Sequence, residues 1–431
     1  MRTILTATLI CWAALPAPAA EETRPFTLRL TVAAAGTPGE HVPVSAAIEL
    51  PEALARARHG VDVRLTGEGA DEPVPCQLVV GPDKAARLWW IVPATGKPSS
   101  WTAALSPRPQ PTKDEKAADE KAKAAPPRAF AVKDAERDHL DVLFAGRPVV
   151  RYMYAFDTST PQRAHETYKV YHHVFDGAGE KLLTKGPGGQ YTHHRGVFLG
   201  FSRLRAGDGR GDYWHMKNVT QRHQRMLEAL AGPVLARHTA SVQWADSHRR
   251  AVIDEKRTVT VFRQPAPTIC LLEFRSELTP AGEDPVTLDG DPEHAGFQFR
   301  AHNDLSRGSR KDERGKPLTS RAGYLFPADK VDLKKELNLP WAAMTFVLHG
   351  KKYAVQHMNH PDNPPGRYSA YRPYGRFGHF PRATVAAGKT LTLRYRICVD
   401  EGQVPSRARM DARRAAFADP PDVAVKPAAT D

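Results

Sequence analysis

The stretch ARHTASVQW, residues 236–244, decides the fold class of this chain. Ala236, His238, Ala240, Val242 and Trp244 lie on one face of an extended backbone, and the residues between them are polar. A repeat of two residues is the period of a β-strand with one buried and one polar face. The stretch therefore predicts a strand of an antiparallel sheet.

Further segments with strand character occur on both sides of it. They are PFTLRLTV (25–32), VDVRLTG (61–67), QLVV (77–80), LWWIV (88–92), TVTVFR (258–263), TICLLEF (268–274), AAMTFVLHG (342–350), YAVQHM (353–358) and LTLRYRICV (391–399). Thr220–Leu230 is ambiguous, because its residues also suit a single helix. Strands do not alternate with helices, which disfavours a parallel sheet. The sequence predicts an all-β protein with a large antiparallel β-sandwich and a small N-terminal β-domain.

The N-terminus has the pattern of a cleaved secretory signal. Arg2 supplies a positive charge, Ile4–Leu15 is apolar, and Ala17–Ala19 offers small residues for cleavage. This order is typical of a signal peptide, here residues 1–20. We therefore expect a secreted or periplasmic protein without an integral membrane segment.

The rest of the chain divides by composition. Residues 21–105 form the predicted N-terminal β-domain, and residues 129–403 the predicted sandwich domain. Between them, residues 106–128 are highly charged and rich in Pro and Ala, which predicts a disordered linker because little apolar surface is available for burial. Residues 404–431 are rich in Arg, Ala and Pro, and are expected to form a surface helix and a frayed tail.

Charge and cysteine content narrow the possible partners. The formal net charge is +13, but no nucleic-acid-binding motif is present, so we expect no nucleic-acid partner. A glycan or another small polar or anionic ligand is compatible with this charge, as is solubility alone. Beyond the signal, Cys76, Cys270 and Cys398 form no disulfide framework. The sequence identifies no cofactor.

Histidine is the most informative residue type, with 18 in the chain. Six lie close together in the sequence, at positions 172, 173, 193, 194, 215 and 223. Such a group can transfer protons or bind metal. Neighbours in extended backbone point to opposite faces, so each adjacent pair is expected to offer one member to a shared site. No HExxH or similar motif occurs, but a metal site assembled from distant strands remains open.

Four segments combine His, Arg, Trp and Tyr with apolar strands. They are YTHHRGVFLGF (191–201), GDYWHMKNVTQRHQ (211–224), LDGDPEHAGFQFRA (288–301) and HMNHPDNPPGRYSAYRPYGRFGHF (357–380). Arginine binds carboxylate or sulfate with two hydrogen bonds, and aromatic rings can stack on sugar faces. Each segment alone could also be an ordinary solvated loop.

Taken together, the motifs GDYWHM, QRHQ, LDGDPEHAGFQFRA, MNHPDNP and SAYRPYGRFGHF resemble the PmoA-like family of exported bacterial proteins, over about residues 142–404. The resemblance implies a β-sandwich similar to the galactose-mutarotase supersandwich, and a strand at Thr220–Leu230. It assigns no catalytic residue, because the family has no established activity. The label "methane oxygenase PmoA" conflicts with a chain that lacks the spans of a membrane subunit.

The first functional hypothesis is an exported hydrolase, lyase or epimerase acting on a glycan. A histidine would move the proton and an arginine would stabilise negative charge. The alternatives are a non-catalytic carbohydrate-binding protein and a metal-dependent oxidoreductase that uses the histidines. A pair of catalytic carboxylates is less favoured, because no spaced pair stands out.

The predicted site combines residues from all four segments. The candidate catalytic residues are His194, His215, Arg195 and Arg300, and the candidate substrate-binding residues are Trp214, Asp212, His294, Arg372, Tyr374 and Arg376. All four segments lie where apolar strands begin or end. We expect Tyr191–Gly196, Gly211–His215, Glu293–Arg300 and Arg372–Arg376 to lie on one face of the main sandwich and to line one positively biased cleft. Of His193 and His194, only His194 is expected to enter it, and Trp214 and Tyr374 are expected to form the sugar platform.

Overall fold

A computed structural model describes residues 25–34, 36–57, 60–81, 85–108, 128–307, 315 and 321–428. The predicted signal peptide and residues 109–127 of the predicted linker lie outside the described residues. Within them the chain is mostly strand, arranged in antiparallel sheets, which confirms the predicted fold class. No helix in the described ranges is long and apolar enough to cross a bilayer.

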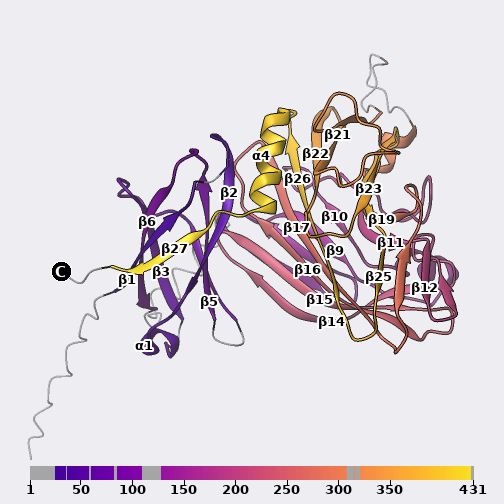
Figure 1. The fold of residues 1–431 in the computed structure, drawn as a ribbon, viewed down its shortest axis with the longest axis horizontal. Helices are drawn as coiled ribbons and strands as arrows, with labels where there is room; N and C mark the ends of the chain where they lie inside the picture. Colours follow the sequence, from indigo (N-terminus) through magenta and orange to yellow (C-terminus); the bar gives the residue numbers. More distant parts are fainter. Residues whose placement is uncertain are drawn as a thin grey trace, which may run out of the picture.

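The N-terminal region contains two small sheets that pack on each other (Figure 1). Its elements are β1 (Phe26–Val32), β2 (His41–Ile48), α1 (Glu52–Ala55), β3 (Val61–Gly67), β4 (Cys76–Val80), β5 (Ala86–Pro93) and β6 (Ser99–Pro107). The sheet orders are β27-β1-β6-β3, where β27 is Val423–Pro427, and β2-β5-β4. Trp90 and Leu88 from β5 pack with Leu30 from β1 in the core between the sheets.

The C-terminal segment returns to this region. The helix α4 (Arg407–Ala418) agrees with the predicted surface helix, but β27 (Val423–Pro427) pairs antiparallel with β1. The expected frayed tail is therefore wrong for Val423–Pro427, because the open edge of β1 supplies backbone hydrogen-bond partners. The last described strand is the edge strand next to the first, so the N-terminal sheets are not built from residues 21–105 alone.

The main sandwich consists of two eight-stranded sheets. We call the first the site sheet; its order is β23 (Gly366–Arg372), β24 (Arg376–Pro381), β19 (Ala295–Arg300), β11 (Val197–Phe201), β10 (Tyr171–Val174), β9 (Arg147–Met153), β8 (His139–Phe144) and β7 (Phe130–Ala135). We call the second the back sheet; its order is β14 (Thr220–Ala231), β15 (Leu235–Ala245), β16 (Ala251–Phe262), β17 (Thr268–Pro280), β26 (Leu391–Glu401), β22 (Lys351–Asn359), β21 (Trp341–Leu348) and β20 (Gly323–Leu325).

Short elements surround the two large sheets. A small sheet contains β13 (Gly209–Gly211), β12 (Arg203–Ala206), β18 (Val286–Asp289) and β25 (Ala383–Val385), and the short helices are α3 (Pro161–Thr167) and η2 (Asn303–Arg307). The ambiguous segment Thr220–Leu230 is a strand, as the family resemblance implies. Its twelve-residue strand β14 pairs with β15 along its length, and this pairing outweighs local helix propensity.

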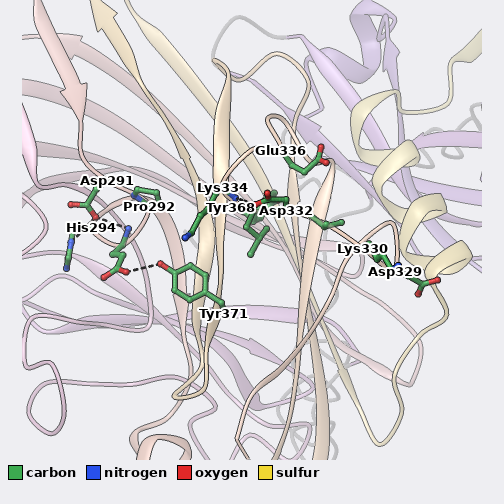
Figure 2. A pocket seen from close by; sticks show the side chains of 13 residues that line it. Asp291, Pro292, His294, Asp329, Lys330, Asp332, Lys334, Glu336, Tyr368 and Tyr371 are labelled. Atoms are coloured by element: carbon green, nitrogen blue, oxygen red, sulfur yellow. Dashed lines mark hydrogen bonds and ion pairs between the residues drawn. The ribbon is translucent and has the colours of Figure 1, made fainter.

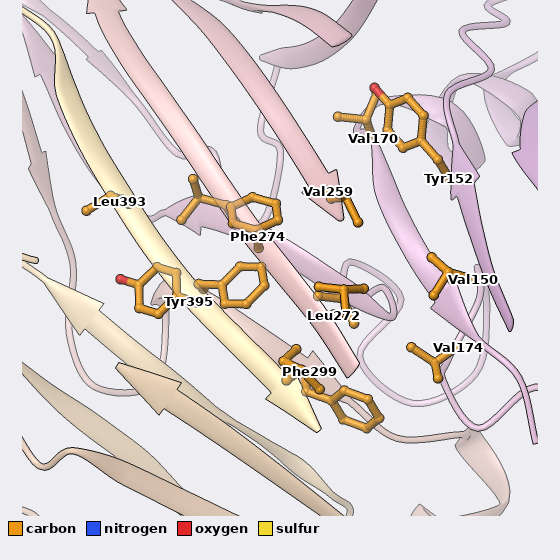
Figure 3. Close-up of a cluster of buried hydrophobic side chains, with 14 of the residues drawn as sticks. Val150, Tyr152, Val170, Val174, Val259, Leu272, Phe274, Phe299, Leu393 and Tyr395 are labelled. Carbon is orange, nitrogen blue, oxygen red and sulfur yellow. The ribbon is translucent and has the colours of Figure 1, made fainter. Parts of the chain in front are cut away.

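The core lies between the site sheet and the back sheet (Figure 3). Phe297 of β19 stacks on Phe274 of β17 and on Tyr395 of β26, with ring centroids 4.2 and 4.8 Å apart. In β15, Ala236, His238, Ala240, Val242 and Trp244 are all buried, as the two-residue period predicts.

A buried ionic network lies in this core. Arg257 donates from Nε and Nη2 to the Glu255 carboxylate at 2.9 Å, and both side chains are fully buried. Trp244 Nε1 and Ser276 Oγ also donate to Glu255. A buried charge is costly without such partners, so this network constrains how β15, β16 and β17 pack.

Fully buried histidines make the fold acid-sensitive. Burial lowers the pKa of His238, His357 and His379 to about 3, far below that of an exposed imidazole. The unfolded chain therefore binds more protons between about pH 3 and 6.5, and stability falls as the pH decreases through that window. At pH 5 each such histidine lowers the free energy of unfolding by up to about 2 kcal/mol relative to neutral pH.

We therefore expect the free energy of unfolding in urea to be several kcal/mol lower at pH 5 than at pH 7.5. The substitution His379→Gln should reduce this difference by up to about 2 kcal/mol, because the imidazole that must stay neutral is removed. His248→Gln, at an exposed turn position, serves as the control and should leave the difference unchanged. An unchanged difference in His379→Gln would contradict the assignment.

A buried ionic network joins the N-terminal sheets to the back sheet through α4. Arg413 of α4 donates to Glu40 at 3.1 Å, to Asp400 of β26 at 2.7 and 3.0 Å, and to Thr268 Oγ1 at 3.0 Å. All three charged side chains are buried. Arg413 thus connects three parts of the chain that are distant in sequence.

Arg413→Ala should destabilise the protein by about 3–5 kcal/mol, because Asp400 would remain buried without its cation and Glu40 would keep only its ion pair with Arg409. Arg407→Ala, on the same helix, removes an ion pair with exposed Asp329 and should cost less than about 1 kcal/mol. Urea denaturation of both variants measures the difference. Equal effects would show that the buried network is not what stabilises this junction.

Candidate functional site

The candidate site lies on the outer face of the site sheet. In β11, Val197 and Leu199 face the main core, whereas Phe198 between them packs with Tyr171 and Trp214 on the other side. In β19, Phe297 and Phe299 likewise face the core, which directs Gln298 and Arg300 outward. Residues from the predicted segments therefore gather over one face of the sheet.

The turn Asp212–Met216 rests directly on this face. A Cβ on Gly200 of β11 would lie 2.5 Å from the Tyr213 carbonyl oxygen, so a glycine is required for the turn to approach. Asp212 Oδ1 accepts hydrogen bonds from the backbone N–H groups of Trp214 and His215. Met216 has a positive φ of 61°, a conformation that costs energy in a residue with a side chain.

Two aspartate–histidine pairs stand side by side in the site. His215 Nδ1 lies 2.8 Å from Asp212 Oδ2, and His294 Nδ1 lies 2.9 Å from Asp291 Oδ1. The two imidazole centroids are 4.9 Å apart. Burial opposes ionisation of Asp212, but its hydrogen bonds with His215 and with the turn backbone lower its pKa below the ordinary value. Asp212 is therefore an anion that orients His215.

Both neighbouring histidines, His193 and His194, belong to the cluster. Their ring centroids are 4.5 Å apart, and His193 is also 4.5 Å from His215. The prediction that only His194 enters is wrong, because residues 191–194 form a turn and not extended backbone. The expectation for His194 rests on a strand that begins at Arg195 and Gly196, whereas β11 begins at Val197.

Burial makes His194 a poor proton acceptor. Its side chain is 3% exposed, and burial together with His193 and Arg376 lowers its pKa well below the ordinary range. Burial and nearby Lys169 lower the pKa of His193 to about 3. Because both imidazoles are neutral at physiological pH, the predicted acid–base role fits His215 better than His194.

Buried cations lie beneath the histidines. Lys169, Lys185, Arg300 and Arg376 hydrogen-bond to carbonyl or amide oxygens, and within the described residues none forms an ion pair with a carboxylate. Burial lowers the pKa of Lys185 to about 7 and that of Arg300 to about 10. The sequence contains no signal that could have placed the two lysines here.

Several buried donors of this layer have no hydrogen-bond partner in the described part of the chain. They are Nε and Nη2 of Arg300, Nε of Arg376, Nε1 of Trp214 and, as a possible donor or acceptor, Nδ1 of His194. An unsatisfied buried polar group costs about 1–3 kcal/mol. Such groups are expected where a ligand or bound water completes the hydrogen bonding.

The aromatic residues divide into buried and accessible ones. Trp214 is fully buried between Phe198 and the Arg376 guanidinium, so it does not offer a face to a sugar. Tyr374 and Tyr191 lie 5.0 Å apart, and Tyr191 is 44% exposed. The expected aromatic platform is therefore better represented by these two tyrosines than by Trp214.

The two remaining predicted arginines have different positions. Arg372, at the end of β23, forms an ion pair with Glu293, which also accepts a hydrogen bond from Tyr371. Arg195 donates to the backbone carbonyls of Thr192, His194 and His165 and lies over Tyr168. The Arg195 side chain is buried and supports the loop. Its guanidinium therefore does not reach the His215–His294 pair, although the sequence places Arg195 among the candidate catalytic residues.

An open pocket of about 1400 Å³ borders the cluster at His294 (Figure 2). Its lining runs from Asp291, Pro292 and Glu293 to residues 329–334 and Glu336, with Tyr368 and Tyr371 between them. Carboxylates outnumber Lys330 and Lys334 in this lining, which differs from the positively biased cleft that the sequence predicts. Positive charge is instead carried by Arg300 and Arg376 in the buried layer beneath, because burial lowers the pKa of Lys169 well below its ordinary value and that of Lys185 to about 7.

The substitution Gly200→Ala should displace the Asp212–Met216 turn, because the new Cβ has only 2.5 Å to a backbone oxygen. We expect a loss of about 1–3 kcal/mol in unfolding free energy and faster hydrogen exchange at the His215 amide. Gly282→Ala has nothing within 4 Å of its Cβ and should change stability by less than about 0.5 kcal/mol. Equal behaviour of the two variants would contradict the close approach.

Comparisons with known proteins add the following. A glycosyl hydrolase family 38 protein from Enterococcus faecalis aligns with 93% of this chain and 47% of its own, at 11% identity and a TM-score of 0.45. A family 36 α-galactosidase from Geobacillus stearothermophilus, in complex with raffinose, aligns with 64% of this chain and 39% of its own, at 9% identity and a TM-score of 0.28. The chain spans less than half the length of either structure, and both scores are too low to bear on its function.

Among curated proteins, none matches the sequence. One family model matches residues 139–414, close to the range of the resemblance described above. It is described as a family of unknown function, and nothing links it to PmoA by name. The chain belongs to this family, DUF6807.

Proposed function

We propose that the protein is a carbohydrate-processing enzyme, acting as a hydrolase, lyase or epimerase, in which His215 and His294 transfer protons. The observation that carries the proposal is the pair of Asp–His hydrogen bonds, 2.8 and 2.9 Å long, at the edge of an open pocket. Each carboxylate engages Nδ1 of its imidazole. Within the described residues, Nε2 of neither ring has a hydrogen-bond partner, so both nitrogens are available to a ligand.

The dyads give the two imidazoles a defined chemistry. A carboxylate at Nδ1 favours the tautomer that carries its proton there, which leaves a lone pair on Nε2 to accept a proton. The same carboxylate stabilises the imidazolium after the transfer. Asp212 has a lowered pKa and stays ionised, so His215 can alternate between base and acid. His215 and His294 are partly exposed, as groups that meet a substrate must be.

The pocket lining is suited to a polyhydroxylated ligand. Carboxylates accept hydrogen bonds from hydroxyl groups, and Asp291, Glu293, Asp332 and Glu336 lie along one pocket with Lys334 (Figure 2). Tyr371 adds an aromatic ring on the same side. A small number of polar groups around an aromatic surface is typical of sites that orient a sugar.

The buried cations support the electrostatics of such a reaction. Arg300 and Arg376 offer guanidinium donors that no described residue uses, in surroundings where charge interactions are stronger than in water. They can stabilise negative charge that develops on a substrate or bind its carboxylate. This arrangement favours proton transfer by histidine over a mechanism with two catalytic carboxylates.

The test is turnover of an oligosaccharide panel that contains neutral and uronate-bearing members. New reducing ends indicate hydrolysis, an ultraviolet-absorbing double bond indicates elimination, and a changed sugar indicates epimerisation. His215→Asn should lower kcat by about 10²–10⁴-fold, because general acid–base catalysis contributes about that much. Asn retains a polar group of similar size, so the melting temperature should change little.

His248→Asn is the control, because that histidine is exposed in the β15–β16 turn and outside the cluster. It should retain full turnover. Binding of a glycan by the unmodified protein without any turnover would instead favour the non-catalytic carbohydrate-binding alternative. Full activity of His215→Asn would exclude the proposed role of the dyad.

A further inference from the structure

A second group of histidines lies outside the proposed proton-transfer pair. One ligand atom from each of His302, Asp304 and His349 lies within 4.8 Å of the other two. The imidazole centroids of His302 and His349 are 5.9 Å apart. None of the three lines the pocket at His294. We call this group the His302 cluster.

The fold brings these residues together from two distant parts of the chain. His302 follows β19, where Ala301 N donates to Gly375 O at 2.7 Å and His302 N donates to Leu183 O at 2.8 Å. Asp304 lies in η2, and its backbone N–H donates to His302 Nδ1 at 3.2 Å. His349 is at the tip of the β21–β22 hairpin, so the cluster joins the site sheet to the back sheet.

The backbone at His349 is unusual for a histidine. His349 and Gly350 form a two-residue hairpin turn with φ values of 51° and 79°. The first position of such a turn is ordinarily Asn, Asp or Gly, because side chains disfavour positive φ. Energetically unfavourable backbone of this kind concentrates where a side chain must meet a ligand. The turn directs an imidazole to a carboxylate and a second imidazole.

The donor set and its spacing suit one ion. Histidine and carboxylate donors about 2.0–2.2 Å from a metal are at most about 4.4 Å from each other, so small side-chain adjustments would complete the coordination. Two imidazoles and one carboxylate select transition metals over Ca²⁺ and Mg²⁺, which prefer oxygen. His302 and Asp304 are 30% and 21% exposed, so an ion can enter.

We propose that His302, Asp304 and His349 bind one divalent transition-metal ion, with Zn²⁺ as the representative case. Three protein ligands leave a coordination position for water. The ion would hold η2 against the β21–β22 hairpin. Its ligand His302 lies two residues after Arg300 in the sequence. The ion would thereby fix the strand end from which Arg300 reaches the buried cation layer.

The experiment uses the full chain without a histidine tag, stripped of metal by a chelator. Calorimetric titration with ZnCl₂ should give about one ion per chain, and the melting temperature should rise with the Zn²⁺ concentration. CaCl₂ and MgCl₂ should produce neither effect. Co²⁺ should give visible absorption bands of a low-coordinate site, a readout that does not depend on activity.

His349→Asn is the decisive variant. Asn tolerates the left-handed turn, so the metal-free protein should keep its melting temperature. Loss of a residue that only supports a metal ligand lowers metal affinity about 10–100-fold, and loss of the ligand His349 should lower Zn²⁺ affinity by more than that. His215→Asn is the control: it removes an imidazole from the proton-transfer pair and should leave Zn²⁺ binding intact. Absence of Zn²⁺ binding, retained binding in His349→Asn, or loss of binding in His215→Asn would overturn the proposal.

Discussion

The stacking of Phe297 between Phe274 and Tyr395 is the constraint on which the rest of the structure depends. It fixes β19 against the back sheet, with the odd-numbered Phe297 and Phe299 buried in the core. Because side chains alternate along a strand, Gln298 and Arg300 must then face the other way. A shift of one residue would exchange the core face and the site face together. Core packing and site geometry are thus set by the same register.

The outer face of the site sheet combines several energetically unfavourable features that folded proteins normally avoid. Lys169, Lys185 and Arg300 are buried without carboxylate partners among the described residues, and several of their neighbours have unsatisfied hydrogen-bonding atoms. Tyr191 and Met216 adopt positive φ angles on the two turns that carry the histidines. The large core between the sheets stabilises the fold enough to tolerate these features. Their concentration in one place is the strongest structural argument that the face binds a ligand.

The alternation of residues 236–244 was sufficient to predict the sheet class, because a period of two is a local property of the sequence. Residues from the four segments meet at Trp214, which contacts His194, His294 and Arg376. What the sequence could not provide is the direction of each side chain. The sequence predicts Trp214 as a sugar platform, but its side chain is buried, and the Arg195 side chain points to the His165 carbonyl. Tertiary packing determines the direction of both side chains.

Other features were beyond sequence reasoning for the same physical reason. No sequence motif surrounds Lys169 or Lys185. Lys169 lies between α3 and β10, Lys185 lies in the loop after β10, and the tertiary fold places both under the histidines. The pairing of β27 with β1 joins residues that are more than 390 positions apart in the sequence, and no local pattern encodes such a contact. Short-range periodicity predicts elements, whereas long-range hydrogen bonds decide which of them meet.

The buried cations and the aspartates divide the histidines into two chemical classes. Burial and neighbouring positive charge lower the pKa of His193 and His194, so these imidazoles remain neutral and act as hydrogen-bonding groups. His215 and His294 are more exposed, and each has a carboxylate that stabilises its protonated form. A general acid or base must reach the substrate, so only the more exposed second pair, oriented by Asp212 and Asp291, is suited to proton transfer. Four neighbouring histidines can therefore have different roles, which are determined by burial and by the charge nearest to each ring.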